Sequence, residues 1–188
     1  MQVFLMHIGH PGHIDIDYTV TKKRAKAEIL RGLPSDAPKR MFFENDRTFR
    51  EAFPSGLFNC WGVPPRAAPS FEKTSIGDLV LIVPWIGVHG GGVQQLGIVK
   101  SKCPVEANSA SPILWPNTPF ERLFPWLFFF DTEKGYRDWY DFLDDLGYDQ
   151  RWNPRGWYRQ IKEHRFRRWG GTAEYLTFLR SKCGFQPI

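Results

Sequence analysis

The sequence has few cysteines and no long hydrophobic segment. Its 188 residues contain three cysteines, and no two of them form a CxxC pair. An odd number of widely spaced cysteines argues against a disulfide framework or a zinc ribbon and is typical of a reducing cytoplasm. No window approaches the roughly 20 apolar residues needed to cross a bilayer, and residues 1–7 lack the charged start of a signal peptide. We therefore expect a soluble, cytoplasmic protein without a membrane segment.

Signatures of catalysis are also missing. There is no G-x-S-x-G, no P-loop, no H-E-x-x-H and no deaminase pair of H-x-E with P-C-x-x-C, and residues 131–134 lack the E-x-K spacing of a restriction nuclease core. His7, His10 and His13 recur at three-residue spacing, but Pro11-Gly12 prevents a shared helix face. The sequence thus predicts a non-catalytic chain without cofactor or metal. A small metal-dependent enzyme that uses the His7/His10/His13 loop is the alternative.

Aromatic side chains and positive charge are abundant. Aromatic residues make up 16% of the chain, with 8 tryptophans and 16 phenylalanines, which is more than the packing of a small domain usually demands. A net charge of +5 favours an anionic partner, and nucleic acid is the first candidate. The length fits one domain with a substantial core.

Short apolar runs separated by turns indicate a β-rich fold. The expected strands are residues 3–8, 41–43, 57–61, 79–83, 93–100, 113–115 and 126–130. The expected helices are residues 22–30, 46–53 with Asp46 as N-cap, 136–146 and 173–180. About six short strands with a few helices suggest an α+β fold built on a closed or half-closed barrel.

The last part of the chain changes in character. Residues 136–146 form an amphipathic helix with an acidic outer face, whereas residues 151–168 are basic and contain one acid, Glu163. Aromatic rings are interleaved with the cations, a pattern that indicates nucleic-acid contact, although a solvated face is the alternative. The candidate phosphate-binding residues are Arg151, Arg155, Arg159, Lys162, Arg165, Arg167 and Arg168.

Two tryptophans stand at similar places in the pattern. Trp61 and Trp115 each end a short apolar run just before turn residues, where a large ring is presented at a loop. Two such rings that face each other would form a slot about one base thick, since bases stack on any aromatic face. The sequence therefore predicts a pocket for a nucleobase turned out of its strand, with burial of both rings in the core as the alternative.

Five segments support this interpretation by their order. They are N-C-W-G-V at 59–63, G-D-L-V-L-I-V at 77–83, L-G-I-V-K-S at 96–101, I-L-W at 113–115 and W-L-F-F at 126–129. Together they resemble a YTH or EVE domain of the PUA-like superfamily over roughly residues 2–131. The resemblance implies a small PUA-like β-barrel that binds a modified base in an aromatic cage. The tail from Tyr136 onward departs from the short ending of that family and resembles modules at the front of modification-dependent restriction enzymes.

The resemblance also implies which residues would hold the base. Trp61 and Trp115 would be the walls of the cage, and Phe120 would supply a third aromatic ring. The expected contacts to the base edge are Gly62, through its carbonyl, and His10, Asn59 and Cys60. An Asn-rich stretch of the family is replaced here by Gly9-His10-Pro11, so the identity of the base stays open.

We expect residues 1–188 to form a single domain, with residues 132–188 as a helical, basic and aromatic extension packed on the barrel. The expected function is to flip a methylated base of DNA into the cage, as the recognition domain of a modification-dependent restriction or defence system with a fused or associated nuclease. A reader of modified or unpaired bases in RNA is the alternative. Stacking returns roughly 1–3 kcal/mol per base against a few kcal/mol for extrusion, so phosphate contacts must supply most of the affinity.

Overall fold

The computed structural model describes residues 1–8, 13–86, 91–106, 110–116, 124–154 and 158–188. Its strands are β1 (Val3–His7), β2 (Arg24–Ala25), β3 (Leu57–Val63), β4 (Leu79–Val83), β5 (Gly92–Cys103), β6 (Trp126–Asp138), β7 (Tyr158–Ile161) and β8 (Gln186–Pro187). Its helices are α1 (His13–Thr19), α2 (Lys26–Gly32), α3 (Pro38–Asn45), α4 (Arg47–Ala52), η2 (Pro65–Ala67), α5 (Ala68–Lys73), α6 (Ser111–Leu114), α7 (Trp139–Asp145), η3 (Glu163–Trp169) and α8 (Thr172–Lys182). The fold is therefore mixed α+β, as the sequence predicts.

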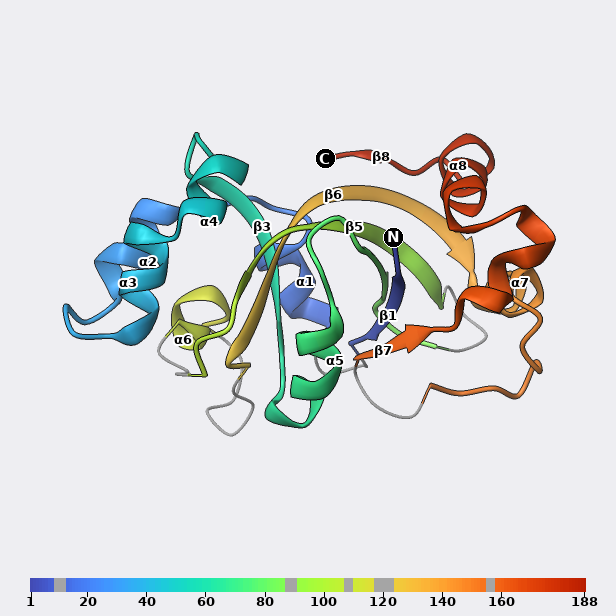
Figure 1. Ribbon diagram of the computed structural model, residues 1–188, viewed down its shortest axis with the longest axis horizontal. Coiled ribbons are helices and arrows are strands. Elements are labelled where there is room, and N and C mark those ends of the chain that lie inside the picture. Colours follow the sequence, from blue (N-terminus) through green and yellow to red (C-terminus); the bar gives the residue numbers. More distant parts are fainter. Residues whose placement is uncertain (9–12, 87–90, 107–109, 117–123, 155–157) are drawn as a thin grey trace.

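One curved sheet collects the strands of the described part. Their order is β2-β3-β6-β5-β4-β1-β7, and β8 also pairs with β6. β1 and β4 are parallel, and the other pairs are antiparallel. β5 and β6 arch across the molecule (Figure 1), and their register shifts between Val93 and Gln95 and between Val99 and Ser101. Such bulges bend a strand and increase its twist, which explains the curvature.

A closed barrel of about six strands is not formed by the described residues. β7 pairs with the outer edge of β1, from Val3 opposite Ile161 to Met6 opposite Tyr158. β2 is the outermost strand at the other end of the sheet, and no described pairing joins it to β7. Of the closed or half-closed barrel that was expected, the closed form is not seen among the described residues, because β7, which comes from the basic C-terminal segment, covers the outer edge of β1.

The sheet separates two hydrophobic cores. Side chains of β4 alternate between them, so that Val80 and Ile82 face one core while Leu79, Leu81 and Val83 face the other. This confirms the strand predicted at 79–83, and both of its faces are buried. We call the first the aromatic core; it is centred on Phe43, Phe49, Phe58 and Phe129. The second, the C-terminal core, is centred on Trp139, Phe142, Phe166, Tyr175 and Leu179.

Helices lie at opposite ends of the sheet. Figure 1 shows α2, α3, α4 and α6 at one end and α7 and α8 at the other. The N-cap prediction is confirmed, since the Asp46 carboxylate accepts a hydrogen bond from the Phe49 backbone amide at 2.7 Å and α4 begins after it. None of the helices in the described ranges has the length and hydropathy that a membrane crossing requires.

Four local predictions are wrong. Residues 41–43 lie in α3 rather than in a strand, because Pro38 begins a helix there whose Phe42 and Phe43 pack into the aromatic core. Residues 113–115 belong to α6 and its C-cap. The helix expected at 22–30 begins at Lys26, after β2. The helix expected from residue 136 begins at Trp139, because the Asp138 carboxylate caps it by accepting from the Tyr140 amide.

The C-terminal segment takes part in the main sheet. The expected boundary at residue 132 falls inside β6, which continues to Asp138. Farther along, β7 pairs with β1 and β8 pairs with β6. The helices of this segment close the C-terminal core. Residues 132–188 are thus built into the sheet as well as packed against it.

Candidate nucleic-acid interface

The structure brings Trp61 and Trp115 together. Trp61 lies on β3 opposite Phe128 of β6, and Trp115 follows α6. The ring centroids are 5.4 Å apart and the ring planes meet at 64°, an edge-to-face arrangement. Phe124 completes the group, with its ring 5.6 Å from that of Trp115. We call these three residues the tryptophan cluster.

The predicted slot between two parallel rings is closed in this structure. Trp61 is 2% exposed and Trp115 is fully buried, and both belong to the aromatic core. The indole N–H of Trp115 donates to Thr19 Oγ1 at 3.0 Å, so the polar atom of this buried ring is satisfied. A base could therefore enter between the rings only if they turned or moved apart.

Gly62 allows the close approach of Trp115 to β3. A Cβ placed on Gly62 would lie 2.8 Å from the Cη2 atom of Trp115 and 2.4 Å from the Cβ atom of Phe124. Any side chain at this position would therefore collide with the tryptophan cluster. The glycine expected to contact the base edge thus lies directly against the expected walls.

Asn59 and Cys60 hold α1 beside the cluster. Asn59 is buried, and its Nδ2 donates to the carbonyl of Val20 at 2.8 Å, just past the end of α1. Burial raises the pKa of the Cys60 thiol well above its ordinary value, although Arg24 and Thr19 act in the opposite sense. Cys60 is therefore a neutral thiol. In this structure Asn59 and Cys60, two of the four residues expected at the base edge, contact the end of α1 instead.

Two cations missed by the sequence reasoning fix the segment that carries Trp115. Arg24 donates to the carbonyls of Ile113 and Leu114, both at 3.1 Å, and pairs with Glu28. Lys39 is fully buried and donates to the carbonyls of Val105 and, at 2.8 Å, Pro125. Burial lowers the pKa of Lys39. The only sequence signal for Lys39 was a lysine two residues before the apolar run Met41-Phe42-Phe43.

Several predicted site residues fall outside the described part. Phe120, His10 and Arg155 lie in the undescribed ranges, and His13 is described only as the first residue of α1. Burial lowers the pKa of His7, which favours its neutral form. Among the described residues, no group of three or more histidines, cysteines or carboxylates could hold a metal ion. The histidine-loop alternative therefore has no described site.

The predicted phosphate-binding residues divide into two kinds, and Arg159, whose guanidinium lies 5.5 Å from the centre of the Trp152 ring, is of the kind that contacts the fold. Arg165 stacks on the Tyr148 ring at 4.1 Å and donates to the carbonyls of Leu146 and Gly147, so it holds the fold together. Arg168 lies 3.8 Å from the Asp145 carboxylate. By contrast, the exposed side chains of three others have no hydrogen bond or ion pair with the described residues. These are Arg151, Lys162 and Arg167.

The cations and the tryptophan cluster are far apart in the fold. Arg167 and Arg168 lie on η3 next to α8, whereas Trp115 follows α6 at the other end of the sheet (Figure 1). A ligand that touches both must extend along the long axis of the molecule. A double-stranded nucleic acid has the required length and charge, whereas a free nucleotide does not.

No protein-family model and no curated protein matches this sequence. A solved structure is similar, however: the N-terminal domain of Thermococcus gammatolerans McrB, bound to m5C DNA. The TM-score is 0.61 at 17% sequence identity, over 96% of this chain and 98% of that chain. The chain has that fold. Because the likeness covers 96% of the chain, it includes most of the C-terminal segment, beyond the 2–131 range of the sequence resemblance.

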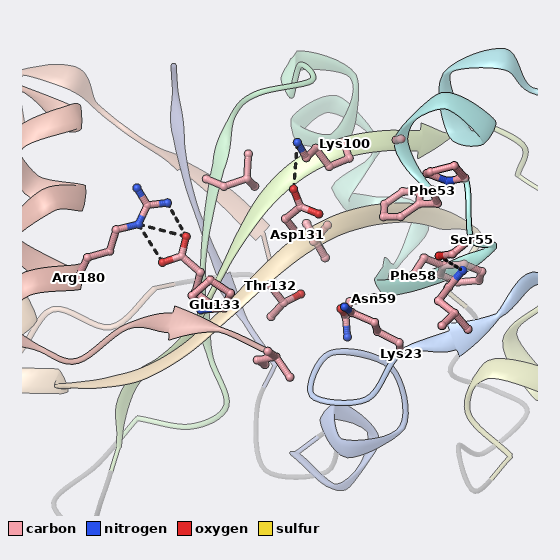
Figure 2. A pocket seen from close by; sticks show the side chains of 17 residues that line it. Lys23, Phe53, Ser55, Phe58, Asn59, Lys100, Asp131, Thr132, Glu133 and Arg180 are labelled. Carbon is pink, nitrogen blue, oxygen red and sulfur yellow. Dashed lines mark hydrogen bonds and ion pairs between the residues drawn. The ribbon is translucent and has the colours of Figure 1, made fainter.

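Within this McrB-like fold, one cavity lies away from the tryptophan cluster. It has a volume of about 460 Å³ and lies along the edge of β6 between β3 and β8 (Figure 2). Its charged groups are largely paired with one another, Lys100 with Asp131 at 2.9 Å and Arg180 with Glu133. A groove with such internal ion pairs offers little net charge to an anionic ligand. We therefore do not place the nucleic-acid contact there.

Proposed function

We propose that this chain is a DNA-binding module that recognises a modified base, as the recognition part of a restriction or defence system. The observation that carries the proposal is the likeness over almost the whole chain to a domain solved on m5C DNA. The net charge of +5 and the unpaired cations on the C-terminal side support an anionic partner. In this proposal the module binds DNA without performing chemistry.

The base would enter the tryptophan cluster after its rings part. Separating the two rings costs roughly 0.5–1.5 kcal/mol for the edge-to-face contact. Releasing the bond from Trp115 to Thr19 costs about 0.5–1.5 kcal/mol more. Stacking of a base returns roughly 1–3 kcal/mol. Stacking therefore at best offsets the opening of the cluster, and the extrusion of the base must be driven by contacts elsewhere on the DNA.

Phosphate contacts would supply most of the affinity. Arg151, Lys162 and Arg167 are the cations best placed for this role, because they are exposed and have no described partner. Each phosphate contact releases counterions, so binding would weaken steeply with added salt. The two ends of the molecule then have separate tasks: one selects the base and the other binds the backbone.

A binding screen at fixed salt tests the proposal. Duplexes with 5-methylcytosine, N6-methyladenine or no modification, and RNA strands of the same sequences, would be titrated with the protein and followed by fluorescence anisotropy. We expect tighter binding to one modified DNA than to its unmodified form. Equal binding to all DNA forms would contradict modified-base recognition. Tighter binding to RNA than to DNA would show that RNA is the ligand.

A further inference from the structure

A smaller cavity on the other side of α1 is assigned no role by the proposed function. Its volume is about 220 Å³, and it lies between α1, the end of β4, and facing parts of β5 and β6. Its walls include Asp17, Thr21, Trp85, Gln95 and Lys134. Pockets for drug-sized ligands usually start at about 300 Å³, so this cavity fits one flat ring system.

Gln95 is the unusual residue of this cavity. It is 3% exposed, and its Oε1 atom has no hydrogen-bond partner among the described residues. On β5 it lies between Ile82 of β4 and Lys134 of β6. Leaving a buried amide oxygen unpaired destabilises a folded protein, and an apolar side chain would fit the neighbouring Ile82 better. The fold alone therefore gives no reason for a glutamine here.

The chemistry of the cavity wall fits a nucleobase. A side-chain amide presents an acceptor beside a donor, which matches the paired donor and acceptor on the edge of a base. Trp85, which also lines the cavity, is half-buried and carries an aromatic ring of the kind on which bases stack. Lys134 is exposed at the same cavity and can reach a phosphate.

We propose that this cavity is a second nucleobase site, in which the Gln95 amide pairs with the edge of a base beside Trp85. The base belongs either to a free nucleotide or to a nucleic-acid strand, and the second source rests on the proposed function. Helix α1 links the two sites, since Ile16 and Asp17 line this cavity while Thr19 holds Trp115. A base in this cavity would therefore act on the helix that also positions the tryptophan cluster.

The test uses Gln95→Leu, with Gln95→Met as a second apolar variant if the branched side chain does not pack. Gln160→Leu is the matched control, because Gln160 is an exposed glutamine on strand β7. Each protein is titrated with the four deoxynucleoside monophosphates while the side-chain amide signals are followed by NMR, and then with a duplex oligonucleotide. Thermal unfolding is measured on the same samples.

We expect the Gln95 variants to bind their base about tenfold more weakly, because a buried hydrogen-bonded pair is lost. In the same variants the melting temperature should rise by roughly 2–4 °C, because an unpaired buried polar group is removed. Gln160→Leu should change neither property. Together, weaker binding and a more stable fold would mark Gln95 as a binding residue rather than a structural one.

The outcomes separate this inference from the proposed function. If no monophosphate and no duplex shifts the Gln95 amide, or if both apolar variants bind as the unaltered protein does, the inference is overturned even when the preference for modified DNA stands. If monophosphates shift the amide and the apolar variants weaken their binding while no DNA binds, the inference stands for free nucleotides and the proposed function fails.

Discussion

The two sides of the sheet use buried charge in opposite ways. In the aromatic core, buried or half-buried cations donate to backbone carbonyls: Lys39 to Val105 and Pro125, and Arg24 to the end of α6. In the C-terminal core, a buried carboxylate gathers side chains, since Asp145 is 3% exposed and accepts from Arg137 and Tyr175. The bond to Asp145 raises the pKa of Arg137 above its ordinary value.

The difference separates what each side stabilises. A cation that binds carbonyls fixes the path of irregular backbone, which is what the segment carrying Trp115 needs. A carboxylate shared by several donors fixes one element on another, here α7 and α8 on the end of β6. We infer that the buried cations of the aromatic core hold the segment of the candidate site in place. The buried carboxylate of the C-terminal core instead attaches α7 and α8 to the sheet.

The largest expected effect is on the C-terminal side. Asp145→Ala would leave the Tyr175 hydroxyl without its acceptor and the Arg137 guanidinium with only its exposed pair to Asp141, and breaking a buried ion pair costs about 3–5 kcal/mol. Asp141→Ala is the control, because its carboxylate is exposed and contacts only Arg137, for about 1 kcal/mol or less. Urea unfolding measures both. Equal losses would contradict the central place of Asp145.

A smaller loss is expected on the aromatic side. Lys39→Met would remove the donor from the buried Pro125 carbonyl and the partly buried Val105 carbonyl, but it would also remove a buried ammonium, so the free energy of unfolding should fall by about 2 kcal/mol. Binding to modified DNA should weaken as the segment around Trp115 loosens. Lys73→Met, at the exposed end of α5, should change neither property. Unchanged DNA binding in Lys39→Met would show that this lysine does not position the DNA-binding site.

The tryptophan cluster should decide the preference for the modified base. Trp61→Phe and Trp115→Phe keep a ring in the core but reduce the stacking surface, so affinity for the modified duplex should fall about tenfold while affinity for the unmodified duplex stays the same. Fluorescence anisotropy gives both values. Trp152→Phe, which lies against the C-terminal core, is the control. If both variants kept the preference for the modified duplex, the tryptophan cluster would not be the base-binding site.

The smallest effect is expected for the exposed cations, and it should appear as salt dependence. Lys162→Gln and Arg167→Gln should each reduce the log–log slope of affinity against salt by about 0.9 on duplex DNA, if each contacts one phosphate. Arg165→Gln is the contrasting variant, because its guanidinium is occupied by Tyr148 and by backbone carbonyls. It should lower stability and leave the slope unchanged. The reverse pattern would place the phosphate contacts on Arg165.

The sequence predicted those parts of the fold that depend on local pattern. The strands at β1, β3, β4 and β5 follow apolar runs between turns, and the Asp46 cap follows its residue type. The run Met41-Phe42-Phe43 was misassigned because three apolar residues fit a strand or a buried helix equally well. The segment is a helix because α3 begins at Pro38 and because the rings of Phe42 and Phe43 pack on Phe49 and Phe129.

The candidate site was predicted in its members but not in its geometry. The order of motifs brought Trp61 and Trp115 together, and the structure makes them neighbours. Their tilt depends on Thr19, which is distant in sequence and reaches Trp115 through the placement of α1. Neither the buried ammonium of Lys39 nor the unpaired amide of Gln95 could be recognised, because burial of a polar residue is a property of the tertiary fold.

The pairing of β8 has a practical consequence for work with this protein. The amide of Ile188 donates to the Thr132 carbonyl, and Ile188 lines the groove of Figure 2. β8 runs antiparallel to β6, so its direction leads along the edge of β6 toward β3. A tag fused after Ile188 would start inside that groove and would displace solvent from it.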